Sequence, residues 1–497
     1  MTRRRFAALT VATALTAAAC GGSDAAESSS ETPLDQTLAP ATTTTTDTGP
    51  ADDIGDGDET EAPFLQLELE EKIDAFQEAP NSVLATNVAT EMALDGDKRW
   101  GPWLLDLLRM GDSTALDDQV AGALEIISGV DNPGFITESY RVYGQWVTDE
   151  DIDPGPGYRD WKMTLLGQID EEFAVLLDGV TDDRELSLIQ WGGVTRGGIP
   201  ELNHQERVPA SEADWMTDNE IVFAVEVDDI AVAYPFRILG HHELANDTIG
   251  DTPVSLVFCT LCRTALLFDR RVEGRVLDFQ TSGLLTNSNK IMVDNQTDTL
   301  WSHLLAKGIS GPLKGIELDQ HPVEATTWAD WAEANPDGET LTIPSPIFFP
   351  GQPERPPIAY EYDPESAYDF YYNDPDVWFP ILDTPNESFP LKTEVLGIES
   401  GGAELALQVE ALADEGPRVF VAGDTPLLVV PNGAGARVYD GSDLDLADGD
   451  RPEIITETSG GVELADGSAL PRLVVDQGFW FAWFNNHPNT QWWPRAE

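Results

Sequence analysis

The stretch VSLVFCTLCR, residues 254–263, joins a run of strand-forming apolar residues to the motif Cys259-x-x-Cys262. Such a short run of Val, Leu and Phe is typical of a buried strand, so we expect the two cysteines where the strand ends and a turn begins. The third cysteine of the chain, Cys20, lies near the N-terminus. The two sulfurs in the folded part therefore define one site, which is a redox dithiol, part of a metal site or a small local disulfide.

Short runs of the same kind occur from residue 191 onward, for example 221–225 and 265–268, and turn residues separate them. This alternation of short apolar runs and turn residues predicts a β-rich, mostly antiparallel region with short helices. Upstream, residues 99–109 and 120–127 carry apolar residues at helical spacing, which indicates a pair of helices. We therefore expect an α+β fold, with a helical domain over residues 63–190 in front of the β-rich part.

An internal repeat predicts that the β-rich part consists of two related units. Residues 222–226 match 395–399, and Gly250–Pro253 match Gly423–Pro426 at the same offset in the sequence. We place the first unit at 191–345, a linker at 346–384 and the second unit at 385–497. At this offset Asn432 and Gly435 replace the two cysteines, so the first unit is expected to carry the site and the second to be structural.

The N-terminus has the pattern of an export signal. Three arginines precede an apolar run at 6–19, which is too short to span a bilayer permanently and ends at Cys20. This resembles a lipoprotein signal peptide over 1–20, and a twin-arginine signal or an ordinary secretory signal are the alternatives. Residues 21–62 are rich in Ser, Thr and Asp and predict a disordered tether. We expect an exported protein held at the outer face of the cytoplasmic membrane by lipid on Cys20.

The composition is strongly acidic. The formal net charge is −61 at pH 7. Nucleic acid carries dense negative charge and is bound through Lys and Arg, so an acidic chain of this kind is a poor partner for it. The sequence therefore predicts no nucleic-acid function.

Any metal held by the cysteine pair needs further ligands. The nearest candidates in the sequence are His242, Met292 and His303, while His241 is expected to point the opposite way on a strand. Two thiolates with imidazole and thioether are soft ligands, which suit copper or another soft metal. In a metal site, we expect the sulfur and imidazole atoms within roughly 4 to 6 Å of one another.

Two further residues are candidates for support of the site. Glu243 would orient the His242 imidazole, as carboxylates do around metal sites, although His242 could also be a polar residue satisfied at a strand end. Arg263 would stabilise a thiolate if it points inward, and it would be an ordinary surface residue if it points outward. A redox partner or a metal-delivery partner is implied by either chemistry, and the residues identify neither.

A series of motifs accompanies the cysteine pair: Gly198-Ile199-Pro200, Glu212-Ala213-Asp214-Trp215, Ala233-Tyr234-Pro235, His242-Glu243, Asn287-Ser288 and Leu300-Trp301-Ser302. With these motifs the chain resembles the domain-of-unknown-function family numbered 3179, closely over 191–345 and loosely over 385–497. The resemblance implies a bacterial or archaeal exported protein and no established activity. The chain departs from the usual family pattern at Thr260, Arg263 and His303, where Pro, Gly and Gln are usual.

Two classes of function follow from these observations. The first is a membrane-tethered protein with a soft-metal or thiol-redox site at the cysteine pair. The second is a binding or scaffolding module without catalysis, in which the cysteines form a structural disulfide. The sequence does not decide whether the protein is an enzyme.

Overall fold

The computed structural model describes residues 71, 83–110, 114–344, 361–364, 368–385, 388–458 and 460–494. The predicted signal peptide with Cys20 and the predicted tether lie outside these ranges, so the structure does not test them. Among the described residues, no helix is both long and apolar enough to cross a membrane.

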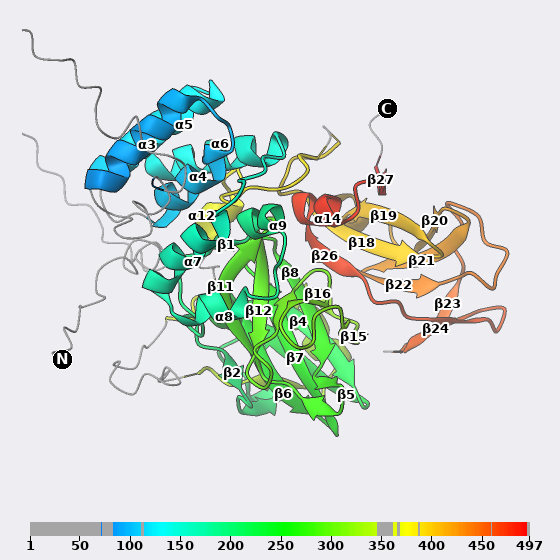
Figure 1. Ribbon diagram of the computed structural model, residues 1–497. Helices are drawn as coiled ribbons and strands as arrows, with labels where there is room; N and C mark the ends of the chain where they lie inside the picture. The colour runs from blue at the N-terminus through cyan, green and yellow to red at the C-terminus, as the bar shows by residue number, and fades with distance from the viewer. Residues whose placement is uncertain are drawn as a thin grey trace, which may run out of the picture.

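Helices occupy the first part of the described chain (Figure 1). The second of them is formed by the apolar segment around Trp100, Trp103 and Leu107, whose side chains are buried against the neighbouring helices. In order, the helices are α3 (Val83–Asp95), α4 (Trp100–Met110), α5 (Thr114–Ser128), α6 (Ile136–Asp149), α7 (Tyr158–Ile169), α8 (Glu172–Leu176) and α9 (Asp183–Leu188).

Three five-stranded sheets follow. The first has the order β1 (Gln190–Trp191), β11 (Phe279–Thr286), β12 (Asn289–Asp294), β13 (Leu300–Ser302) and β14 (Lys307–Ser310). The second has the order β15 (Gln320–His321), β8 (Thr264–Asp269), β7 (Thr252–Cys259), β6 (Leu244–Ile249) and β2 (Leu202–Asn203). The third has the order β16 (Glu324–Thr327), β4 (Ile221–Val227), β5 (Ile230–Pro235), β17 (Glu339–Leu341) and β3 (Arg207–Pro209).

The remaining strands form smaller sheets. A two-stranded ribbon pairs β10 (Arg275–Val276) with β9 (Arg271–Val272). A four-stranded sheet has the order β26 (Asp476–Phe479), β18 (Glu394–Ser400), β19 (Ala403–Gln408) and β27 (Gln491–Trp493). Two three-stranded sheets contain β20 (Arg418–Ala422), β21 (Thr425–Pro431) and β22 (Ala436–Asp440), and β23 (Ile454–Thr458), β24 (Gly461–Leu464) and β25 (Ala469–Pro471).

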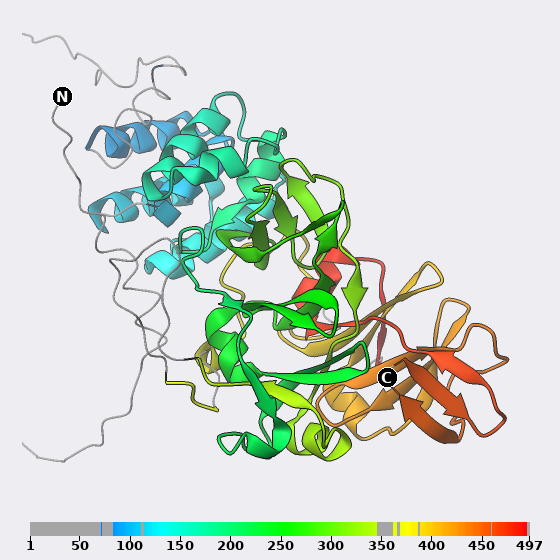
Figure 2. The same ribbon diagram turned by 90° about the horizontal axis from the view of Figure 1, so that it is seen from below.

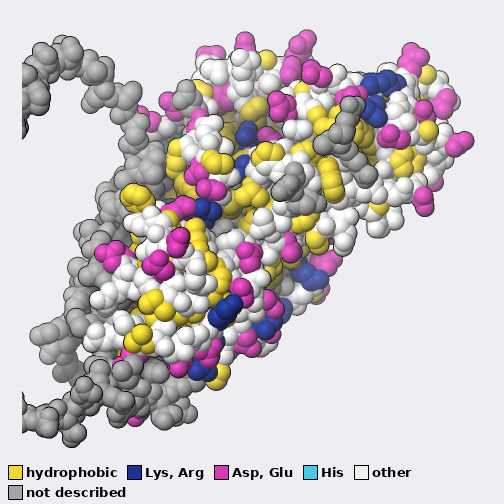
Figure 3. Space-filling model, turned by 90° about the horizontal axis from the view of Figure 1, so that it is seen from above, with side chains coloured by type: hydrophobic (Ala, Val, Ile, Leu, Met, Phe, Trp, Pro, Cys, Tyr) yellow, Lys and Arg dark blue, Asp and Glu magenta, His cyan; other side chains and the backbone are white. Residues whose placement is uncertain are grey.

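Short helices connect the strands: α10 (Phe236–His242), α11 (Trp328–Ala334), α12 (Asp369–Tyr372), α13 (Val409–Ala413) and α14 (Trp480–Asn486). The helices α3 to α7 gather at one end of the molecule, and strands β20 to β24 lie at the opposite end (Figures 1 and 2). Acidic side chains are spread over the face seen in Figure 3, as the net charge of −61 predicts.

The expected fold class, a helical domain followed by two related β-rich repeat units, is wrong. The described residues form six sheets of three to five strands each, accompanied by twelve short helices. This arrangement is a six-bladed β-propeller. Propellers consist of repeated small sheets, so their short strands resemble those of other β-rich folds in sequence. The strands of one sheet also come from distant positions, such as Trp191 opposite Leu284, and this pairing leaves no local signal.

Two of these sheets have the same strand order. In β16-β4-β5-β17 and in β26-β18-β19-β27, a central hairpin has an antiparallel neighbour on its first strand and a parallel neighbour on its second. The matched segments 222–226 and 395–399 lie in β4 and β18, the first strands of these hairpins. The sequence matches therefore fall at corresponding places in two individual sheets.

The hairpin of β7 and β8 lies between two apolar layers. Val254, Leu256 and Phe258 of β7 pack in one layer, and Val257 packs in the other together with Leu266. Both faces of the hairpin are therefore buried, which explains the continuous apolar run in its sequence. The loop at its end reaches a third apolar cluster, which the helices α3 to α9 largely form.

Candidate metal or thiol centre at Cys259, Cys262 and His303

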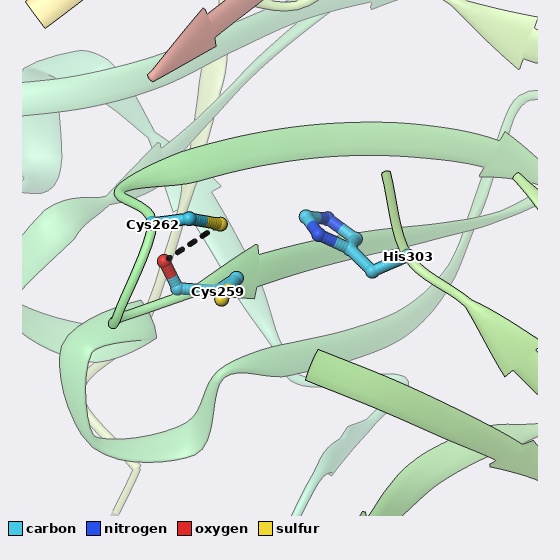
Figure 4. Close-up of side chains that lie close together, drawn as sticks. All are labelled: Cys259, Cys262 and His303. Carbon is cyan, nitrogen blue, oxygen red and sulfur yellow. Dashed lines mark hydrogen bonds between the residues drawn. The ribbon is translucent and has the colours of Figure 1, made fainter. Parts of the chain in front are cut away.

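The two cysteines occupy the turn between β7 and β8. Cys259 is the last residue of β7 and pairs with Thr264, the first residue of β8. Residues 260–263 connect the strands, and Arg263 adopts a left-handed backbone conformation with φ of 55°. The Cys262 Sγ atom folds back to lie 3.9 Å from the carbonyl oxygen of Cys259 (Figure 4). Both cysteines are buried free thiols.

His303 approaches the thiols from another sheet (Figure 4). It follows β13 directly, and its Nε2 atom lies 3.1 Å from the backbone oxygen of Val257. A carbonyl oxygen only accepts hydrogen bonds, so Nε2 carries the proton and donates it. Burial, and next the positive charge of Lys290, lower the pKa of His303 to about 3. The ring is therefore neutral near pH 7, and Nδ1 keeps its lone pair.

The three side chains form one compact cluster. The ligand atoms of Cys259, Cys262 and His303 all lie within 4.8 Å of one another, inside the range expected for a metal site. All three are buried, with exposed fractions of 1%, 0% and 0%. A hydrogen bond from the second ring nitrogen to a backbone carbonyl is the usual way in which proteins orient a metal-binding histidine. The cluster thus offers two sulfurs and one imidazole nitrogen to a soft ion.

The two thiols differ in acidity. Burial raises the pKa of Cys259, but hydrogen bonds from the Cys262 side chain and backbone and the charge of Lys290 outweigh it, so that the net pKa is lowered. Burial, followed by the hydrogen bond to Cys259 and its negative charge, raises the pKa of Cys262 well above its ordinary value. Cys259 is therefore the more acidic thiol of the pair, and Cys262 is the less acidic one.

Asn289 on β12 borders the pair, because its side-chain amide lies 3.0 Å from Cys262 Sγ. With the NH2 group toward the sulfur, the amide oxygen faces the backbone oxygen of Lys290, and two acceptors repel. Half a turn of the amide lets it donate to Lys290 O at 3.1 Å and accept from Lys290 N at 3.3 Å. We adopt this second orientation, in which the amide oxygen faces Cys262 Sγ.

A buried ion pair supports the cysteine loop. Lys290 of β12 donates to the Glu243 carboxylate, and the Thr260 hydroxyl donates to the other oxygen of this carboxylate at 2.7 Å. The backbone oxygen of Glu243 also accepts from Phe258 N at 2.7 Å. Glu243 was expected to orient His242, but its side chain instead joins Lys290 to the loop between the cysteines.

His242 lies outside the cluster. The sequence predicts a strand here, but residues 236–242 form the helix α10, and His242 is not one of the clustered residues. Its Nδ1 lies 2.7 Å from the Pro200 carbonyl oxygen and its Nε2 lies 2.7 Å from the Tyr362 hydroxyl. Both ring nitrogens therefore have protein partners, and burial lowers the pKa of His242 to about 4. Its neighbour His241 is partly exposed on the same helix.

Met292 also lies away from the cysteines. Side chains alternate along β12, and Ile291 and Val293 pack in the apolar cluster that contains Cys259 and Cys262. Met292 points to the opposite face, where it packs with Trp301 and its neighbours. Alternation thus excludes Met292 from the face of β12 that borders the thiols.

Arg263 points neither at the thiols nor fully into solvent. Its guanidinium lies 5.2 Å from the ring centre of Tyr372 and 5.9 Å from that of Phe236, and it forms a 3.8 Å ion pair with Glu394. The positive charge that lowers the pKa of Cys259 comes from Lys290 instead. Sequence reasoning did not identify Lys290 or Asn289, although a lysine inside the apolar strand sequence 289–294 is an unusual feature.

Later segments cover the loop. Tyr371 on α12 donates from its hydroxyl to the backbone oxygen of Leu261 at 3.0 Å, and Phe479 N donates to the Cys262 backbone oxygen at 2.9 Å. Strand β26, which contains Gly478, runs beside β8 (Figure 1). The centre therefore depends on residues from four separate parts of the chain.

Together, the small sheets and the buried pair of thiols with one imidazole define a β-rich protein with a candidate soft-metal or thiol centre. Within this class, the chain belongs to the family described as a protein of unknown function (DUF3179), which matches residues 196–490. The match includes the cysteine motif and His303. No curated protein and no solved structure matches the chain.

Proposed function

We propose that the chain binds one soft metal ion, copper in its monovalent state, between Cys259, Cys262 and His303. The observation that carries this proposal is the cluster of two thiols and one neutral imidazole within 4.8 Å, with the second ring nitrogen fixed by Val257. Thiolate ligands favour monovalent copper, and a buried apolar surrounding protects it from water. In this function the protein holds copper for a metal-delivery partner at the cell surface.

The proposal includes the location of the protein. An export signal, a lipid on Cys20 and a flexible tether would place the copper centre outside the cytoplasmic membrane. This placement rests on the sequence pattern of the N-terminus. Copper handling is a need of exported proteins that meet the metal before it enters the cell, and the predicted anchor agrees with that role.

Anaerobic titration of the reduced protein with monovalent copper, in competition with a coloured chelator, tests the binding. We expect one ion per chain, and X-ray absorption should find two sulfur ligands and one nitrogen ligand. Cys262→Ser and His303→Asn should each weaken binding at least about tenfold, since each removes one ligand. The control His204→Asn removes an exposed imidazole and should change nothing. Absence of binding, or nitrogen ligation retained in His303→Asn, would contradict the proposal.

A second function is favoured by the unequal thiols. Cys259 as thiolate attacks a small disulfide and releases one thiolate from it. Cys262 then displaces the second thiolate, so that the protein gains its own disulfide while the substrate gains two electrons. Equilibration of the metal-free protein with reduced and oxidised glutathione measures this reaction. A stable Cys259–Cys262 disulfide that forms reversibly, in a chain that binds no copper, would favour this function over the first.

A further inference from the structure

A pocket lies beside the cysteine loop, on the side away from the buried thiols. Its volume is about 370 Å³, which is within the usual range for small-molecule sites. Phe223, Phe236 and Ala265 of one apolar cluster line it, together with Val409 and Val475 of another cluster and with Ala413. The lining is mainly apolar, so the pocket suits a ligand with an apolar body.

Arg263 is the cation of this pocket. Its side chain is 31% exposed, and it lies over the aromatic rings of Phe236 and Tyr372. Within the described part of the chain it has an ion pair with Glu394 at 3.8 Å but donates no hydrogen bond. A guanidinium has five N–H donors in a planar fork that matches a carboxylate. Arg263 therefore presents to a mainly apolar pocket N–H donors that make no hydrogen bond to a described residue, while its charge is paired with Glu394.

Two acidic residues, Glu394 and Glu410, also line the pocket. Glu394 accepts a 2.6 Å hydrogen bond from Gln477, which holds its carboxylate beside the Arg263 guanidinium. Glu410 is exposed on the helix α13. With two carboxylates and one guanidinium in its lining, the pocket would repel a ligand with a second negative group, so it favours a single carboxylate.

The backbone fixes Arg263 in place. At φ of 55° it has the left-handed conformation, which costs a residue with a Cβ atom about 1 kcal/mol or more. This conformation directs the side chain from the turn toward the pocket while the preceding residue, Cys262, remains buried. The loop thus presents a thiol on one side and a guanidinium on the other.

We propose that this pocket binds a small, mainly apolar monocarboxylate, with its carboxylate on the Arg263 guanidinium and its apolar body between Phe223 and Val409. The site goes beyond the copper centre and does not depend on it. A ligand here would contact the residue that follows Cys262, so occupancy of the pocket and of the thiol centre can influence each other.

Calorimetric titration of the whole purified chain with octanoate, and with octanamide as the neutral match, tests the site. We expect octanoate to bind at least about tenfold more tightly than octanamide, because only the carboxylate is charged. Arg263→Gln should remove this preference, and Arg271→Gln, an arginine outside the pocket, should keep it.

Ala413→Phe would add a large side chain to the lining of the pocket and provides a second test that leaves Arg263 unchanged. This variant should weaken the binding of both octanoate and octanamide, while the chain should still bind one copper ion. Equal affinity for octanoate and octanamide, octanoate binding retained in Arg263→Gln, or no binding at millimolar ligand would each overturn the proposal. Copper titration of the same variants tests the metal proposal independently, so failure of the carboxylate proposal can be distinguished from failure of the copper proposal.

Discussion

The Thr260 hydroxyl donates a 2.7 Å hydrogen bond to Glu243, whose carboxylate is also paired with Lys290. Thr260 lies between the two cysteines, so this bond connects the loop directly to a buried ion pair. Lys290 is 4% exposed and Glu243 is 5% exposed. The same lysine lowers the pKa of Cys259, whereas the Glu243 charge raises it, so within this ion pair only the lysine favours the thiolate.

Lys290→Met should therefore destabilise the protein by about 3–5 kcal/mol, because it leaves the Glu243 carboxylate buried without its partner. The double variant Glu243→Gln with Lys290→Met removes both charges and should recover part of this loss. Denaturant unfolding of the two variants measures the difference. If the single variant is as stable as the original chain, the carboxylate does not depend on Lys290.

The pKa of the Cys259 thiol should rise in Lys290→Met, which lacks the lysine charge, and should rise less in the double variant, which also lacks the Glu243 charge that raises it. Absorbance of the thiolate near 240 nm as a function of pH follows this change. Lys307→Met provides a control, because this lysine is half exposed and paired with Glu317. It should leave both the stability and the titration of Cys259 almost unchanged.

Gly478→Ala should damage the contact between β26 and the cysteine loop. An added Cβ atom would lie 2.0 Å from Thr264 Oγ1 and 2.9 Å from the Cys262 backbone oxygen. The backbone cannot yield as a flexible side chain does, so we expect the free energy of unfolding to fall by about 1–3 kcal/mol. Thermal or denaturant unfolding measures this loss. Gly167→Ala has no atom within 4 Å of the added Cβ and lies in a helix, so it should be neutral or slightly stabilising. Equal effects of the two changes would contradict this contact.

Cys20→Ala tests the predicted lipid anchor. The apolar run at 6–19 and the following cysteine predict that the mature chain begins at a lipid-modified Cys20. The variant should appear in the soluble fraction of cells, whereas the original chain should stay with membranes until detergent is added. Ser23→Ala, three residues beyond, is the matched control and should remain membrane-bound. Retention of Cys20→Ala at the membrane would mean that another segment holds the protein there.

The sequence predicted part of the candidate site because a local motif carries it. Cys259 and Cys262 are close in the chain, and the apolar run before them sets the strand that ends at the first sulfur. His303 was one of three candidate ligands, and no local pattern separates it from His242 or Met292. The choice depends on which sheets pack together, and this information is not present in any one segment.

The other differences between the sequence-based predictions and the structure also have physical causes. Residues 236–242 form a helix after Pro235 instead of the expected strand, and strand alternation turns Met292 away. Lys290 was not predicted as a site residue, because the role of a buried lysine depends on its partner, here Glu243, and the partner is distant in the sequence. The fold class was predicted wrongly because repeated short strands do not reveal which of them share a sheet.

The pH dependence of stability provides the last prediction. His303 has a pKa of about 3 in the folded chain and an ordinary value of 6.5. Between these values the unfolded chain binds a proton that the folded chain does not, so acid favours unfolding. The contribution of His303 to the free energy of unfolding should be complete above pH 6.5. It should fall by roughly 5 kcal/mol as the pH approaches 3.

His303→Asn should remove this part of the pH dependence. Carboxylates and His242 also titrate in the same range, so the measured quantity is the difference in unfolding free energy between the original chain and the variant at each pH. This difference should shrink steadily from pH 6.5 to pH 3. A proton and a copper ion compete for Nδ1 of the ring, so copper affinity should not decline through protonation of His303 until the pH is near 3. A difference that stays constant across this range would show that His303 is protonated as easily in the folded chain as in the unfolded one.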